Sequence, residues 1–515
     1  MERSLILRNI INLSISEVIS RLLNFISYIY LARVILVEGF GIISFVIAFS
    51  SYFLLIVNFS SDIIASREVA RLQVNRETLV SQVIATRILL AIASYALLSV
   101  LVMLLQTTST IRIGLLIYGL TFFAQAFNIS WYFRGTEKTL PITTAQIFSS
   151  LINVALIVTI VSAKTDLVYA ISIITTTAFL NSLLLLGFYR REMNKRLIPD
   201  IQNGREQKTS LILDAGLVNE RKTSLILDAE FGSENKERSI LDSGFMRRNL
   251  SESFPVAIAG IMISIYYNLD HVILGYMTNS TELGYYAAAY KIIIIALVPA
   301  GIIYQAFLPQ FTRSKNDAYH TAGLMELYSN LMLIVGAFFT TIIFLFAKDI
   351  IGIAYGAQYS NSILLIQILA FNIFLVYLNM TYGNPLIAWG QQKQFSYPII
   401  VAAMGNLLLN IILIPRYHAA GAAIATISSE LIVLAGFIPL HKKLTKTIHI
   451  KNICKSIAGF IVPSLALLEL ENYLTSIMKI VIVVLSYSFL FHNFKLTSFF
   501  RMTEMYPKKR IYPVV

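Results

Sequence analysis

Apolar stretches of about twenty residues recur along almost the entire chain, separated by short segments that carry most of the charge. A helix of this length crosses the roughly 30 Å hydrocarbon core of a bilayer. The pattern therefore predicts an all-α polytopic membrane protein with about 14 transmembrane helices. These spans are expected at residues 11–31, 40–60, 84–105, 112–133, 142–163, 167–189, 252–275, 284–308, 324–346, 361–382, 395–415, 418–440, 453–470 and 473–492.

The composition supports this interpretation. Of the 515 residues, 57% are hydrophobic and only 13% are charged, which is too little charge to cover the surface of a soluble domain of this size. The single cysteine, Cys454, excludes an intrachain disulfide and a CxxC metal or redox site. The chain contains no HExxH, P-loop or GxSxG motif. We therefore expect a protein that is not an enzyme and that binds no metal or cofactor.

The distribution of basic residues orients the chain in the membrane. With the N-terminus inside, the 190–250 segment carries 12 inside positive charges. Even without this long segment, about 20 inside charges stand against five on the outer loops, which is a strong positive-inside bias. We expect a multi-pass protein of the cytoplasmic membrane with both termini in the cytoplasm. Topology explains the net charge of +13, so no nucleic-acid partner is expected. The five outer residues are Arg33, Arg112, Lys164, Lys348 and Arg416.

Two short internal similarities indicate that the chain contains two related halves. Each similarity pairs one segment with another six spans later: 38–49 with 282–293, and 133–147 with 388–402. In the first pair Gly41 matches Gly284. An offset of six spans gives the halves the same orientation, which is the parallel-repeat arrangement of transporters that hold substrate between their halves. The expected parts are an N-terminal half (1–189), a cytoplasmic inter-half loop (190–250), a C-terminal half (251–440), and two extra spans with a basic tail (441–515).

The inter-half loop repeats itself. EQKTSLILDAG at 206–216 recurs as ERKTSLILDAE at 220–230, and a weaker copy, ERSILDSG, follows. The copies place Leu211, Val218 and Leu225 at intervals of seven, a spacing compatible with a short amphipathic helix on the membrane or on a partner. The alternative is a tandem duplication, tolerated because a longer cytosolic loop costs little. Under either interpretation the loop lies off the transport path.

Polar residues inside the spans form one-sided stripes. In the first span, Ser14, Glu17, Arg21, Asn24 and Tyr28 are spaced 3, 4, 3 and 4 residues apart, so they share one helical face. Intramembrane charge is costly and marks substrate or ion pathways. The stripes predict a polar, partly cationic seam suited to an anionic head group, because Arg and Lys donate charge-assisted hydrogen bonds to phosphate. Its other members are Ser44, Ser51, Asn58, Asp62, Arg87, Asp270, His271, Lys291, Asn406, Asn410, Thr426 and Glu430.

Several members of the seam also have plainer interpretations. These are mutual neutralisation of Glu17 and Arg21, ion pairing of Lys291 with Asp270, snorkelling of Asp62 and Arg87 at the membrane interface, a structural or solvated role for His271, and interhelical hydrogen bonding by Asn406 and Asn410.

Three segments carry a family resemblance. YLARVILVEGFGIISFVIAF (30–49), LDHVILGYMTNSTELGYYAAAYKI (269–292) and HAAGAAIATISSE (418–430) resemble the polysaccharide transport (PST) family of the MOP flippase superfamily, which includes the Wzx-type O-antigen flippases. The likeness covers nearly all of the membrane portion. The long 190–250 loop departs from it, since this loop is usually short in the family. The resemblance implies a MATE-like fold, with two six-helix halves around a central cavity and two C-terminal helices.

The resemblance also implies a function. It is the movement of an isoprenoid-pyrophosphate-linked oligosaccharide from the cytoplasmic to the outer leaflet by alternating access, for the biosynthesis of O-antigen, capsule or exopolysaccharide. The carrier is undecaprenyl or dolichyl pyrophosphate, and the candidate coupling ions are H⁺ and Na⁺. Membrane lipid and glycan polymerase or assembly proteins are further candidate partners. The alternatives are a small-molecule or multidrug cation antiporter of the same superfamily, which the cationic seam disfavours, and a glycan polymerase or ligase, which the short outer loops disfavour.

By the same resemblance, individual residues of the seam receive roles. The candidate contacts of the pyrophosphate–sugar head group are Arg21, Arg87 and Lys291, with Asn24 and Asn58 beside them. The candidate gating or coupling acids are Glu17, Asp62, Asp270 and Glu430.

Overall fold

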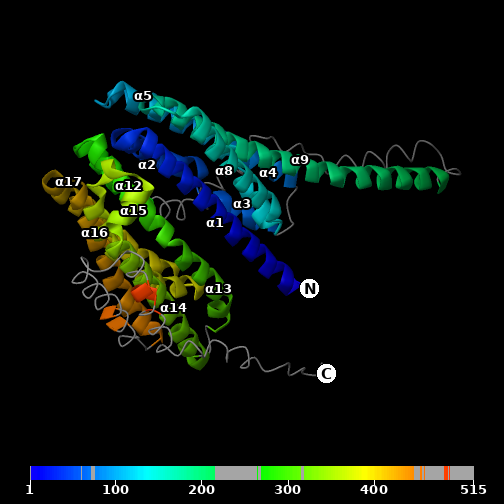
Figure 1. Ribbon diagram of the computed structural model, residues 1–515. Coiled ribbons are helices and arrows are strands. Elements are labelled where there is room, and N and C mark those ends of the chain that lie inside the picture. Colours follow the sequence, from blue (N-terminus) through cyan, green and yellow to red (C-terminus); the bar gives the residue numbers. More distant parts are fainter. Residues whose placement is uncertain are drawn as a thin grey trace. The chain divides into compact units, whose positions relative to one another are not determined.

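The computed structural model of the chain describes residues 2–59, 61–70, 76–214, 264, 268–314, 318–445, 453–454, 457–458, 481–484 and 487. These residues form helices joined by short turns, with no β-strand among them (Figure 1). The chain divides into two compact units. Unit 1 comprises residues 1–24, 50–159 and 168–260, and unit 2 comprises residues 25–49, 160–167 and 261–515.

The helices follow one another closely along the chain. They are α1 (Glu2–Val34), α2 (Leu36–Asn58), α3 (Ser61–Ala70), α4 (Arg76–Leu104), α5 (Ser109–Gly119), α6 (Thr121–Ala126), α7 (Ser130–Gly135), α8 (Leu140–Ile160), α9 (Leu167–Asp214), α12 (Ser280–Ala296), α13 (Val298–Ser314), α14 (Ala318–Leu345), α15 (Ala347–Ala354), α16 (Ser362–Ala388) and α17 (Gln392–Thr445), with short 3₁₀ turns at Lys164–Asp166 and Ala357–Tyr359.

Nine helices in the described part of the chain are long and apolar enough to cross a membrane. One of them, α17, contains two predicted spans, 395–415 and 418–440, because the chain turns at His418 (φ 49°, ψ −129°). In addition, α1 covers the first predicted span. Eleven of the predicted spans therefore correspond to helices. The spans predicted at 252–275, 453–470 and 473–492 lie wholly or largely outside the described residues. The prediction of an all-α, multi-pass membrane protein is confirmed.

Unit 1 contains two helix breaks that are joined by packing. The first separates α2 from α3, where Phe59 has a positive φ of 40°. The second separates α6 from α7 within the predicted span 112–133. The helices that follow the breaks pack together, since the Ser66 hydroxyl of α3 donates to the Trp131 carbonyl of α7 over 2.8 Å. The fully buried rings of Trp131, Tyr132 and Phe133 form the centre of the hydrophobic core at this place.

Unit 2 contains a close crossing of α2 and α12. A side chain at Gly41 would collide with the Ser280 carbonyl, and a side chain at Gly284 would collide with the Val37 carbonyl. Small residues allow two membrane helices to bring their backbones together in this way. Gly41 and Gly284 are also the matched glycines of the internal similarity. A reciprocal contact of this kind is expected if α2 and α12 are equivalent helices of two related halves, and the division into halves itself stays a prediction.

The inter-half loop begins as a helix. α9 runs without interruption from Leu167 to Asp214, a length of about 72 Å at 1.5 Å per residue (Figure 1). Its last 25 residues lie beyond the predicted end of the sixth span at residue 189 and include most of the first copy of the repeated phrase. The second copy lies outside the described residues. The prediction of an amphipathic helix in this loop stays untested, because side-chain placement is described only as far as Asn194.

Candidate functional site

A buried carboxylate lies at the centre of a polar cluster in unit 2. Asp270 belongs to the helical segment 268–277 and is only 3% exposed. Its Oδ1 accepts a hydrogen bond from Asn410 Nδ2 over 2.6 Å. Its Oδ2 accepts one from Thr426 Oγ1 over 2.6 Å and one from the Tyr286 hydroxyl over 3.0 Å. The cluster therefore joins the 268–277 segment, α12 and both arms of the kinked helix α17.

Further polar groups extend this Asp270 cluster along α17. Asn410 also donates to Asn406 Oδ1 over 2.9 Å, and Asn406 Nδ2 lies 3.4 Å from Ser429 Oγ. The predicted interhelical hydrogen bonding by the two asparagines is therefore confirmed. Asn410 Oδ1 is buried and has no hydrogen-bond partner among the described residues. This oxygen and the Asp270 carboxylate are both acceptors, so the cluster has more acceptor capacity than its donors use.

The electrostatics of the Asp270 cluster favour a bound positive charge. No ion pair to Asp270 is formed within the described part of the chain, where its partners are neutral amides and hydroxyls. A buried carboxylate needs a compensating charge or a proton. Carboxylate, amide and hydroxyl oxygens are the ligand types that hard cations prefer. The described residues contain no group of three or more His, Cys, Asp or Glu side chains able to hold a metal ion.

Lys291 of unit 2 contacts an aromatic ring. Its ammonium group sits over the ring of Tyr28, 4.0 Å from the ring centroid. Such a cation–π contact holds the charge in place and leaves N–H donors available to a ligand. The alternative of a Lys291–Asp270 ion pair is not observed. His271, next to Asp270, makes ring contacts with Tyr286 and Tyr290 at centroid distances of 5.1 and 5.2 Å, in agreement with a structural role.

Two of the predicted residues on α1 form an ion pair. Arg21 Nη2 and Glu17 Oε1 lie 2.5 Å apart, and their side chains are 47% and 50% exposed. The predicted mutual neutralisation of this pair is therefore present in the structure. Asn24 lies one turn further along α1 and is half-buried. The side chain of Ser14 lies outside the described residues.

Arg87 lies in a different environment from Arg21. Its side chain is 1% exposed, and its guanidinium donates to Asn58 Oδ1, to Ser61 Oγ and, over 2.6 Å, to Asp62 Oδ1. It also donates to the Asn128 carbonyl over 2.9 Å. These partners belong to the α2–α3 break and to the turn between α6 and α7. The Arg87 network therefore fixes both helix breaks of unit 1, which is a structural arrangement and not the predicted snorkelling.

The last predicted acid, Glu430, is 4% exposed in unit 2. Asn379 Nδ2 of α16 donates to its Oε2 over 2.6 Å and to its main-chain carbonyl over 3.0 Å. Glu430 thus joins α16 to α17, one turn beyond Thr426 of the Asp270 cluster.

Sequence reasoning missed Tyr286 as a member of the Asp270 cluster. The signal was present, because a tyrosine inside an apolar span needs a partner for its hydroxyl. Tyr286 precedes a run of three alanines, and this run allows close packing around the ring.

This chain is similar in sequence to proteins of a known family. Residues 6–315, which are more than half of the chain, match the family model described as "Polysaccharide biosynthesis protein". The chain belongs to this family. Relatives of the family include the "Putative O-antigen transporter" of Escherichia coli (strain K12), 24% identical over 432 residues that cover 83% of this chain and 94% of that protein. A second relative is the "Probable low-salt glycan biosynthesis flippase Agl15" of Haloferax volcanii, 25% identical over 31% of this chain and 34% of that protein.

Solved structures of other proteins share the fold of this chain. The inward closed conformation of the lipid II flippase MurJ matches with a TM-score of 0.67 and 15% identity, over 96% of this chain and 99% of that chain. An inward-facing multidrug resistance MATE transporter of the MOP superfamily matches with a TM-score of 0.59 and 12% identity, over 85% and 99%. The predicted MOP-type fold and the predicted family are both confirmed. The roles of individual residues stay predictions.

Proposed function

We propose that this family member is a flippase that moves isoprenoid-pyrophosphate-linked oligosaccharides from the cytoplasmic to the outer leaflet for cell-surface polysaccharide biosynthesis. The observation that carries the proposal is the family match over residues 6–315, together with relatives named as an O-antigen transporter and a glycan flippase. The MOP-type fold supports alternating access as the mechanism. The proposed location is the cytoplasmic membrane, with both termini in the cytoplasm, and assembly proteins of the glycan are the proposed partners.

The proposed head-group contacts are Arg21 and Lys291. Both carry a charge that is held in place by a weak partner. Arg21 is paired with an exposed glutamate, and a pair of this kind contributes at most about 1 kcal/mol. Lys291 is held over an aromatic ring, a contact of similar strength. A pyrophosphate would therefore replace the partner of either cation at a small cost in free energy. Asn24, on the same face of α1 as Arg21, is the proposed neutral contact.

Arg87 and Asn58 have stronger partners. To reach a head group, the Arg87 guanidinium would have to leave the hydrogen bonds that it makes with Asn58, Ser61, Asp62 and Asn128. Each hydrogen bond to a charged group contributes about 1.5–3 kcal/mol. The contacts therefore favour a structural role for Arg87 and Asn58. In this account Asp62 supports Arg87 and does not act as a coupling acid.

The proposed coupling acid is Asp270. The hydrogen bonds from three neutral side chains hold its carboxylate without neutralising it, so a proton or Na⁺ would bind there. Binding would change the hydrogen bonds that join the 268–277 segment to both arms of α17, and release would restore them. This differential contact is what couples an ion to a conformational change. Glu430 is the proposed second acid, because it lies one turn from Thr426 and binds the neighbouring helix α16. Glu17 is the proposed gating partner of Arg21.

Complementation tests the proposal. In a strain that lacks the protein, Arg21→Ala and Lys291→Ala are expected to reduce surface glycan while the protein remains at its normal level in the membrane. Lys348→Ala removes an exposed cation that lies on a predicted outer loop, so it serves as the control and should be neutral. Full surface glycan with both alanine variants would overturn the head-group role of these residues.

The second candidate function is a small-molecule cation antiporter. The observation that favours it is the likeness to multidrug MATE transporters, which shows the fold alone. An antiporter would export organic cations and leave lipid-linked oligosaccharides in place. Sensitivity of the deletion strain to cationic dyes, with intact surface glycan, would favour this function.

A further inference from the structure

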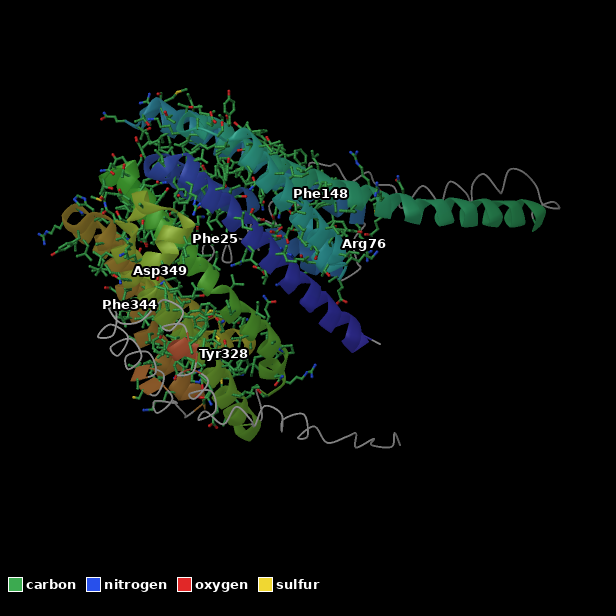
Figure 2. All side chains as sticks on the ribbon, viewed as in Figure 1. Phe25, Arg76, Phe148, Tyr328, Phe344 and Asp349 are labelled. Carbon is green, nitrogen blue, oxygen red and sulfur yellow. The ribbon has the colours of Figure 1, made fainter. Side chains whose placement is uncertain are left out.

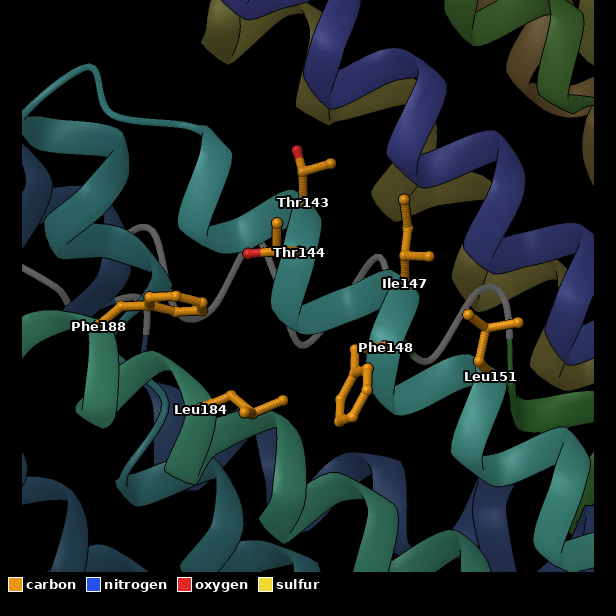
Figure 3. A pocket seen from close by; sticks show the side chains of 7 residues that line it. All are labelled: Thr143, Thr144, Ile147, Phe148, Leu151, Leu184 and Phe188. Atoms are coloured by element: carbon orange, nitrogen blue, oxygen red, sulfur yellow. The ribbon is translucent and has the colours of Figure 1, made fainter.

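An apolar groove lies between α8 and α9 of unit 1 (Figure 3). It has a volume of about 450 Å³. Ile147, Phe148 and Leu151 of α8 line one wall, and Leu184 and Phe188 of α9 line the other. Phe148 and Leu151 are half exposed, so the groove opens to the surroundings of the helix pair. Both helices are long and apolar enough to cross a membrane, so an apolar groove between them is suited to contact with hydrocarbon chains. Figure 2 labels Phe148 among the side chains of the chain.

The length of the groove suits a chain within one leaflet. Its α8 wall runs from Thr143 to Leu151, which is about 12 Å at 1.5 Å per residue. Half of the bilayer core is about 15 Å thick. An acyl chain of a phospholipid in that leaflet would therefore be covered over most of its length. A long isoprenoid chain would extend well beyond the groove.

The end of the groove near Thr143 and Phe188 is polar and basic. Arg191 follows Leu184 by seven residues and Phe188 by three, which places it on the same face of α9 as both. It is exposed, and it takes part in none of the ion pairs formed among the residues that the structure describes. Lys138, which precedes α8, pairs with Glu192 of α9 over 2.9 Å. The Lys138–Glu192 pair is neutral as a whole, so the positive charge at this end is that of Arg191.

An unpaired hydroxyl lies at the same end. Thr143 lines the groove, and its Oγ1 is shielded from solvent and has no hydrogen-bond partner within the described part of the chain. Buried hydroxyls are normally hydrogen-bonded, so this unpaired one lacks the partner that its burial would require.

We propose that the α8–α9 groove is a binding site for one anionic phospholipid, with an acyl chain between the two helices and its phosphate at Arg191 and Lys138. The groove supplies an apolar surface for the chain, and the uncompensated Arg191 supplies selectivity for a negative head group. In the proposed topology this lipid belongs to the cytoplasmic leaflet. The residues that line the groove are different from those proposed to bind the transported head group.

Native mass spectrometry of the full-length protein tests this site. The probes are phosphatidylglycerol and phosphatidylcholine with identical acyl chains. The wild type is expected to bind phosphatidylglycerol about fivefold more tightly, since one basic residue near a lipid phosphate contributes a factor of this size. Arg191→Gln should remove the preference. Arg190→Gln is the matched control, because Arg190 is exposed but points to a different side of α9, and it should keep the preference.

A second pair of variants tests the groove itself. Leu151→Trp fills it and is expected to lower the affinity for both lipids. Leu183→Trp adds the same ring to an exposed position of α9 that does not line the groove, and it should leave binding unchanged. Equal binding of the two lipids by the wild type would overturn the proposal, and so would equal effects of the two arginine variants. Selective displacement of phosphatidylglycerol by a polyprenyl phosphate would also overturn it, by assigning the groove to the carrier lipid.

Discussion

Removal of the Arg87 guanidinium is expected to destabilise the protein strongly. In the Arg87→Gln variant, Asp62 Oδ1 would lose its charged donor, and the oxygens of Ser61 and Asn58 and the Asn128 carbonyl would lose theirs. Arg87 is 1% exposed and Asp62 is 23% exposed in this pair. Breaking a buried ion pair by removing one partner costs about 3–5 kcal/mol. By contrast, breaking the exposed Arg21–Glu17 pair should cost less than about 1 kcal/mol.

The assay is denaturant-induced unfolding in mixed micelles, with the free energy of unfolding measured for each variant. Arg21→Gln is the matched control, because it removes the same side chain from an exposed pair. Asp62→Asn and the Arg87→Gln/Asp62→Asn double variant complete a cycle, and the double variant should be less destabilised than the sum of the two singles by about 0.5–3 kcal/mol. An Arg87→Gln protein within about 1 kcal/mol of the wild type that nevertheless loses transport would refute this reasoning and restore the predicted head-group role.

Three further predictions concern packing, coupling and the substrate. Gly41→Val should prevent accumulation of folded protein, because its side chain would collide with the Ser280 carbonyl. Gly187→Ala should be tolerated, because nothing lies within 4 Å of an added Cβ; detergent-solubilised yield measures both. Asp270→Asn should abolish any dependence of transport on pH or Na⁺, and an unchanged ion dependence would transfer the coupling role to Glu430. Lys291→Gln should reduce binding of a soluble pyrophosphate–sugar without changing the unfolding midpoint, as checked by calorimetry, and unchanged affinity would contradict its head-group role.

The sequence predicted most of the fold because the membrane imposes a length and a polarity on every span. It did not predict the breaks at Phe59 and at residues 127–129, or that α9 continues as a helix to Asp214. These features depend on tertiary contacts and on side chains that no hydropathy pattern records. The Arg87 network is an example, since it joins segments that are about 25 and 41 residues away from Arg87 in the chain.

The polar residues were found more readily than their partners. The polarity of side chains inside the spans singled out Asp270, Asn410 and Thr426, because each polar residue in a span has to be compensated. It did not predict that these three residues converge, because Asn410 and Thr426 lie 140 and 156 residues from Asp270 in the sequence. It also did not predict that Lys291 contacts an aromatic ring and not a carboxylate. Pairing between distant helices depends on packing, and helical periodicity describes only one helix at a time.

Exchange of a lipid-linked oligosaccharide between the two leaflets of proteoliposomes tests the central claim most directly. The account predicts that the purified protein accelerates exchange of a polyprenyl-pyrophosphate oligosaccharide, and that Lys291→Gln slows this exchange while Lys348→Gln does not. Absence of acceleration with every such lipid, accompanied by efflux of a small organic cation from the same vesicles, would contradict the flippase account and establish an antiporter.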